Sequence, residues 1–176
     1  MLGLVLGLAG AIIVGAAAIG VVFVLGMRAK SPRVQGAVIW LGKHAFNRVQ
    51  MRTAGTPGAY AAIVRHRGRG SGQAYETPVG AVAFADGFLI SLPYGRSNWA
   101  RNVLAAGAAV LVYEGEAFDV DSPEIIPLTT VETVFAPGDQ RMHRIFGVTD
   151  VLRLRRLDAV DEGELAGEIA SVAEAA

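Results

Sequence analysis

Hydrophobic positions divide the chain into a long apolar run, a short amphipathic stretch and a series of brief alternating runs. Residues 2–27 are apolar or glycine without interruption. A bilayer core about 30 Å thick is crossed by about 20 apolar residues in a helix, so residues 1–27 predict a transmembrane helix. A cleaved signal peptide is the alternative. It is disfavoured because no basic residue precedes the run, and because a signal core is only about 7–15 residues long.

Residues 28–58 predict a basic juxtamembrane linker that contains an amphipathic helix. Ser31-Pro32 marks a break after the apolar run. Over residues 37–51 the apolar side chains recur at helical spacing, and the other face is polar and basic. Such a helix either lies on the bilayer surface or packs against the following domain.

Residues 59–157 contain short runs typical of strands, over 59–66, 75–85, 88–92, 108–113, 116–120 and 151–157. Helices are expected over 99–106 and around 139–146. Asp86-Gly87 between two apolar runs indicates a hairpin turn. Because the strands follow one another through hairpins and do not alternate with helices, the pattern predicts a mainly β (α+β) domain, a small antiparallel barrel. Residues 158–176 form an acidic C-terminal tail, either a loosely held helix or a frayed end.

Composition narrows the chemistry. A chain of 176 residues suits one domain plus an appendage. The absence of cysteine excludes disulfides, a thiol nucleophile and cysteine-based metal sites. Three scattered histidines share no metal-binding spacing, and no acid–base pair stands out, so we expect neither a metal site nor a catalytic side chain.

The net charge of zero conceals an uneven distribution. Residues 1–27 carry no charge, residues 28–75 carry nine basic and no acidic residues, and residues 76–176 carry all sixteen acidic residues. Basic residues directly after a membrane helix place the rest of the chain in the cytoplasm, so we expect a single-pass protein of the cell membrane with a cytoplasmic domain. The same charges attract anionic headgroups. The membrane accounts for the basic residues and no nucleic-acid-binding motif is present, so nucleic acid is not an expected partner.

Small residues at four-residue spacing in the apolar run suggest a homodimer. Gly3, Gly7, Ala11 and Gly15 lie on one face of the expected helix. Small residues at this spacing allow two membrane helices to approach closely. The alternative is that glycine and alanine are simply common in membrane helices.

Two stretches are candidates for ligand binding. Residues 68–72 (GRGSG) form a glycine-rich loop that contains Arg69 and follows Arg65 and Arg67. The loop is suited to an anion or is only a flexible hairpin loop. Residues 92–102 pass from a strand to a helix N-terminus, where amides favour anions. Tyr94 and Trp99 there offer surfaces for a planar ring, although Trp99 equally suits a core position.

Three stretches in this order resemble the deazaflavin-dependent nitroreductases, also called F420H2-dependent quinone reductases: GRGSGQAYETPV (68–79), LPYG…NWARNVLAAG (92–107) and FGVTDVLRLRR (146–156). The resemblance implies a split β-barrel related to flavin-reductase-like barrels, with the cofactor F420 and its phosphate end at the glycine-rich loop. FMN is an alternative cofactor on such a barrel. The implied cofactor-binding residues are Arg69, Gly70, Ser71, Gly72, Tyr75, Glu76, Thr77, Pro78, Val79, Gly80, Ser91, Leu92, Pro93, Tyr94, Asn98, Trp99, Arg101 and Asn102.

The chain departs from that family at two positions. Gly70 and Tyr94 stand where members that use F420 often carry a basic residue, and the arginines that compensate would be Arg65, Arg67, Arg96 or Arg101. The resemblance therefore implies a membrane-anchored F420H2-dependent oxidoreductase that passes hydride to a lipophilic acceptor, such as a quinone, a nitro compound or an activated double bond. The alternative is a non-catalytic lipid- or fatty-acid-binding protein on the same barrel, with no cofactor.

Overall fold

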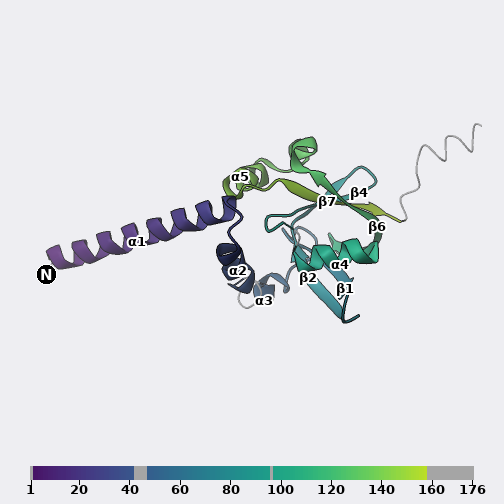
Figure 1. The fold of residues 1–176 in the computed structure, drawn as a ribbon, viewed down its shortest axis with the longest axis horizontal. Helices are drawn as coiled ribbons and strands as arrows, with labels where there is room; N and C mark the ends of the chain where they lie inside the picture. Colours follow the sequence, from purple (N-terminus) through teal and green to yellow (C-terminus); the bar gives the residue numbers. More distant parts are fainter. Residues whose placement is uncertain (1, 42–46, 96, 158–176) are drawn as a thin grey trace, which may run out of the picture.

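The computed structural model describes residues 2–41, 47–95 and 97–157, with side chains described from Ile12 onward except at 47 and 48. Figure 1 shows a long N-terminal helix attached to one end of a curled sheet. The helices are α1 (Leu2–Arg28), α2 (Pro32–Leu41), α3 (Asn47–Gln50), α4 (Asn98–Ala106), α5 (Pro137–Phe146) and the 3-10 turns Leu128–Thr130 and Glu132–Val134. The strands are β1 (Ala62–Arg67), β2 (Ala74–Val79), β3 (Ala81–Phe84), β4 (Gly87–Ser91), β5 (Ala108–Tyr113), β6 (Glu116–Pro127) and β7 (Asp150–Arg156).

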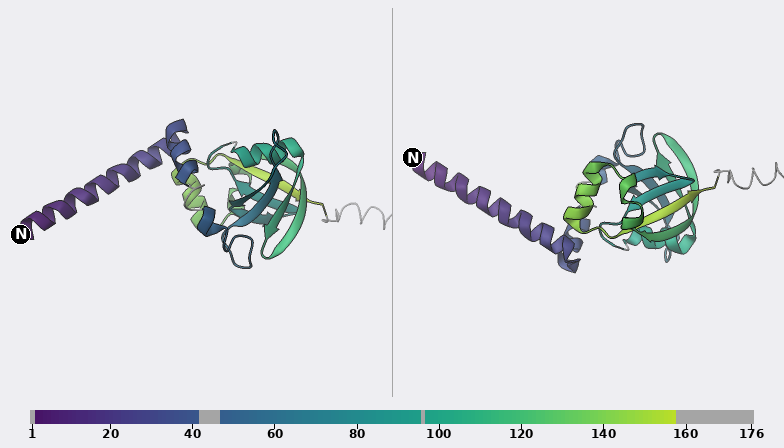
Figure 2. Two further views of the ribbon diagram at one scale, coloured as in Figure 1. Left: turned by 90° about the horizontal axis from the view of Figure 1, so that it is seen from below. Right: turned by 90° about the horizontal axis from the view of Figure 1, so that it is seen from above.

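The seven described strands form one antiparallel sheet in the order β2-β1-β5-β6-β7-β4-β3. Its two edge strands, β2 and β3, are consecutive in the chain and are separated only by Gly80. The sheet must therefore curl until its edges approach each other, as the views along the domain show (Figure 2). This strand pairing confirms the prediction of a mainly antiparallel α+β domain.

Two strands differ from the prediction. The expected strand over 75–85 breaks at Gly80 into β2 and β3, because glycine carries no side chain to pack on a pleated surface and often marks a bend. The strand expected over 116–120 continues to Pro127. Between Asp121 and Glu124 its register against β7 shifts, and Ser122 there has a φ of 49°. Such a bulge bends a strand without ending it. A Ser-Pro pair in the sequence is compatible with a bend in the strand or with its end, so it did not indicate that the strand continues.

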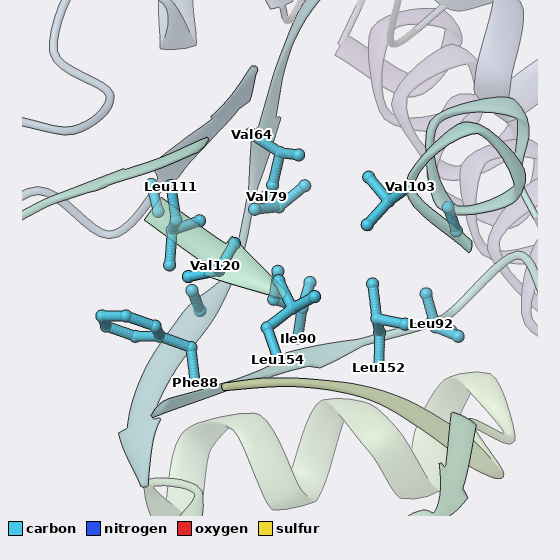
Figure 3. Close-up of a cluster of buried hydrophobic side chains, with 13 residues drawn as sticks. Val64, Val79, Phe88, Ile90, Leu92, Val103, Leu111, Val120, Leu152 and Leu154 are labelled. Carbon is cyan, nitrogen blue, oxygen red and sulfur yellow. The ribbon is translucent and has the colours of Figure 1, made fainter. Parts of the chain in front are cut away.

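The main core lies inside the curled sheet (Figure 3). Side chains at alternate positions of β4 and β7, with Val64, Val103 and Leu111, are buried there. The opposite face of β4 is also buried, because Leu89 packs with Val151 of β7 under the 3-10 turns and α5. Burial on both faces explains why β4 reads as a continuous apolar run.

Helix α1 extends well beyond the domain and touches it only near its C-terminal end (Figure 2). There Phe23 packs edge-on against Phe146 of α5 at 5.7 Å, and Arg28 Nη1 donates to the carbonyl of Arg144 at 3.2 Å. Within the residues whose side chains are described, no single helix has the length and apolarity needed to cross a bilayer. The helices Ile12–Arg28 and Pro32–Leu41 reach that length and composition only as a pair, bent by 110°.

The linker matches its prediction in part. Residues 37–41 and 47–50 are helical as expected, but α2 already starts at Pro32, directly after a turn in which Lys30 has a φ of 53°. Proline suits the first turn of a helix, so Ser31-Pro32 marks a start as well as a break. None of the α2 side chains is buried. The middle of the predicted helix, residues 42–46, and the tail 158–176 lie outside the described residues.

Candidate functional site

The glycine-rich stretch forms the tight loop of the β1–β2 hairpin. The amide of Gly68 donates to the carbonyl of Gln73, and the amide of Gly72 donates to the carbonyl of Gly68. Gly72 has a φ of 65°, a conformation that glycine adopts without steric cost. Beside both Gly70 and Gly72 the space is open to 4 Å, so a ligand can approach this backbone closely.

The three arginines before and within this loop have different partners. Arg65 pairs with Glu76 across the hairpin at 2.9 Å. Arg67 donates to the carbonyl of Gly72 at 3.3 Å, and Arg69 donates to Oδ1 of Asn102 at 2.9 Å. Among the described residues, neither Arg67 nor Arg69 has a carboxylate within 4.0 Å, so both exposed guanidinium groups retain charge for an anion.

A buried polar network joins this loop to α4. Asn102 accepts from Arg69 through Oδ1, so its amide nitrogen faces Nδ1 of His66 at 3.2 Å. This arrangement makes Nδ1 of His66 the acceptor and places the ring proton on Nε2, which donates to Thr77 Oγ1 at 3.1 Å. Burial lowers the pKa of His66, which favours this neutral form. Tyr75 stacks on the imidazole at 5.7 Å.

The remaining predicted residues of α4 divide between core and solvent. Trp99 packs against the main core, as the alternative interpretation expected, whereas Asn98 and Arg101 are exposed. At the helix start, Ser97 makes no side-chain cap, and its buried Oγ has no partner among the described residues. Arg96 lies outside the described residues.

A cavity of about 400 Å³ lies at the other end of β2, between the sheet, α5 and the C-terminal end of α1. Four predicted site residues contribute to its wall: Gly80, Ser91, Pro93 and Tyr94. Two others, Val79 and Leu92, are buried in the main core instead. The cavity is mostly apolar, and its lining includes Phe23 and Met27 of α1 together with Phe135, Met142 and Phe146.

Two polar pairs interrupt the apolar lining. Ser91 Oγ lies 2.8 Å from Nε2 of His143, and Tyr60 donates to Asp139 at 3.1 Å. His143 is only 6% exposed, and its Nδ1 is buried without a partner among the described residues. Burial lowers the pKa of His143, whereas burial and the Asp139 carboxylate raise the pKa of Tyr60. Burial also raises the pKa of Tyr94.

Sequence reasoning missed His66, His143, Tyr60, Asp139 and the contribution of α1. The spacing of Asp139, Met142, His143 and Phe146 was a usable signal, because residues three, four and seven apart lie on one helix face. No comparable signal exists for His66, whose partners come from β2 and α4.

The predicted site residues thus form two clusters and not one. The loop, His66 and Asn102 lie at one end of β2, and the cavity lies at the other. A strand of six residues is about 20 Å long. A single ligand that contacts both clusters must therefore be elongated and lie along β2.

No protein-family model matches this sequence, and no curated protein matches it. Several solved structures are similar, and one of them has a TM-score of 0.38 and 14% sequence identity, over 62% of this chain and 78% of the other. A likeness at that level identifies neither a family nor a function.

Proposed function

We propose that the protein is a membrane-attached, F420H2-dependent reductase of a lipophilic acceptor. The observation that carries the proposal is the arrangement along β2. One end carries two arginines without a carboxylate partner among the described residues, beside an open glycine-rich backbone, and the other end borders an apolar cavity. The three stretches that resemble deazaflavin-dependent reductases contribute to both ends.

The residues present fit an elongated cofactor with an anionic end. Arg67 and Arg69 supply charge, the backbone at Gly70 and Gly72 leaves room for a phosphate group, and Asn102 holds Arg69 in place. These arginines would supply the positive charge that members of the family often carry at the position of Gly70. When bound, the reduced deazaflavin supplies a hydride.

The protein's own contribution is positioning and exclusion of water. The bend at Gly80 and the end of β4 would form the wall against which a planar ring lies. Ser91 and His143 would offer a hydrogen bond to the oxygen of an acceptor, and Phe135 holds the imidazole edge-on at 4.9 Å. A well-oriented pair of reactants needs no side-chain nucleophile.

The membrane helix would give a lipophilic acceptor direct access. Phe23 and Met27 of α1 line the cavity, so the same helix that would lie in the bilayer also forms part of the site. Arg28, Lys30 and Arg33 would hold this end at the cytoplasmic headgroups.

The test is oxidation of F420H2 by the full chain in detergent, with a lipophilic naphthoquinone as acceptor. We expect turnover that falls at least about tenfold in Arg69→Ala, because a charge-assisted contact contributes about 1.5–3 kcal/mol. Arg141→Ala is the matched control, since Arg141 is exposed on α5 and does not line the cavity. Absence of turnover with quinone, nitro and enone acceptors contradicts the proposal.

A second function is favoured by one observation, the predominantly apolar lining of the cavity next to α1. A non-catalytic lipid-binding protein would use this cavity alone and leave the loop arginines without a ligand. It would co-purify with lipid and would bind neither F420 nor FMN.

A further inference from the structure

The cavity offers hydrogen bonds but almost no charge. Of the described residues that line it, Asp139 alone carries a formal charge, and none is lysine or arginine. His143 contributes no positive charge near neutral pH, because burial lowers its pKa. A carboxylate placed here would lose its hydration, find no cation, and lie near a second carboxylate.

One polar side chain in the cavity wall has an atom without a partner among the described residues. His143 lines the cavity and is more than nine-tenths buried, and its Nδ1 makes no hydrogen bond to any described residue. Leaving a buried nitrogen unsatisfied is unfavourable. Because Nδ1 itself has almost no accessible surface, the imidazole would have to turn slightly to present it to the cavity. A ligand group that then bonds to Nδ1 removes this unfavourable term.

We propose that the cavity binds an uncharged amphiphile, a hydrocarbon chain with a carbonyl or hydroxyl head that hydrogen-bonds to His143, and that it discriminates against fatty-acid anions. The chain would lie along the apolar wall formed by Phe23, Phe146 and Met27, toward the end at which α1 leaves the domain. The inference deepens the proposed function, on which it rests for the position of the acceptor.

The Ser91–His143 pair suits either type of head. With Ser91 donating to Nε2, the ring proton lies on Nδ1 and donates to a carbonyl oxygen. With Nε2 donating to Ser91, Nδ1 is free to accept from a hydroxyl group. The serine hydroxyl rotates to serve both tautomers, so the same site accepts a ketone and the corresponding alcohol.

The experiment is photo-crosslinking of the full chain in detergent micelles, without any cofactor. Two diazirine probes of equal chain length are compared at neutral pH, one ending in a hydroxyl and the other in a carboxylate. Crosslinked peptides are located by mass spectrometry. We expect the hydroxyl probe to label the ends of α1 and α5, and the carboxylate probe to label them at least about tenfold less.

Variants connect the labelling to His143. His143→Phe, which fills the space without a polar atom, should lower labelling by the hydroxyl probe about three- to tenfold, the effect of one lost hydrogen bond. His143→Gln keeps a hydrogen-bonding side chain and should restore part of it, and Arg141→Ala, on the exposed side of the same helix, should change nothing. Equal labelling by both probes, labelling that survives His143→Phe, or no labelling of these peptides overturns the inference. Because no cofactor is present, each of these results is independent of whether the protein reduces anything.

Discussion

The guanidinium of Arg69 donates to Oδ1 of Asn102 across 2.9 Å, although 33 residues separate the two in the chain. The same amide group donates to the imidazole of His66. Asn102 therefore joins the glycine-rich loop, strand β1 and helix α4 at one point. The loop is held in place by a buried side chain and not only by its own hairpin.

Asn102→Leu should destabilise the fold and weaken binding of an anionic ligand at the loop. The substitution leaves Nδ1 of His66 buried without a donor, and an unsatisfied buried group costs about 1–3 kcal/mol. Chemical denaturation measures the change. Asn98→Leu on the exposed side of the same helix should stay within about 0.5 kcal/mol of the wild type, and equal effects of the two substitutions would refute this role for Asn102.

Folding stability should fall as the pH drops below about 6.5. Burial lowers the pKa values of His66 and His143 in the folded state, so the unfolded chain binds protons first. The stability these residues contribute is complete above their ordinary pKa of 6.5, and it is lost as the pH falls from there through the folded values. Urea unfolding at a series of pH values measures the free energy of unfolding. Below pH 6.5 this free energy should fall less steeply with pH in His143→Gln than in the wild type. An unchanged slope in the variant would count against its burial in the neutral form.

Gly87→Ala should destabilise the sheet by about 1–3 kcal/mol, the usual effect of overpacking. A methyl group at Gly87 would collide with the backbone of β7 at Leu154 and Arg155, which cannot move without breaking the β4–β7 ladder. Gly138 in α5 faces open space, so Gly138→Ala is the matched control and should stabilise the protein slightly. Thermal unfolding of the two variants should shift in opposite directions.

Phe23→Ala should reduce binding of a lipophilic ligand, because it removes part of the cavity wall and the ring contact to Phe146. An aromatic pair contributes about 0.5–1.5 kcal/mol in addition to the effect of burying its surface. Without the pair, the affinity should fall at least about threefold. Ile19→Ala, one turn away and 73% exposed, should leave binding unchanged. The measurement is the concentration of lipophilic ligand that is needed to suppress labelling by the hydroxyl-ended diazirine probe. Equal binding in both variants would show that α1 is not part of the site.

The sequence predicted local structure better than the assembled site. Short, mainly apolar runs located β1, β4 and β5, and the alternation of apolar and arginine side chains located β7. The pairing of His143 with Ser91 was beyond reach, since 52 residues separate them and α5 must fold over β4 before they meet. Trp99 shows a different limit, because an aromatic side chain that suits a ligand ring suits a core equally well.

Spacing also could not show that the implied cofactor residues divide into two clusters. Residues 75–80 follow the loop directly, which gives the impression of one continuous site. The extended geometry of β2 instead carries Gly80 about 20 Å from the hairpin tip. Only the fold reveals that the cavity at Gly80 is completed by α1 and α5.

The most direct test of a cofactor site at the β1–β2 loop is titration of the full chain, in detergent, with F420 while its fluorescence is followed. We predict saturable binding in the micromolar range that weakens at least about tenfold in both Arg67→Ala and Arg69→Ala and is unaffected in Arg141→Ala. Absence of binding by the wild type, or equal binding by all three variants, would contradict a cofactor site at this loop.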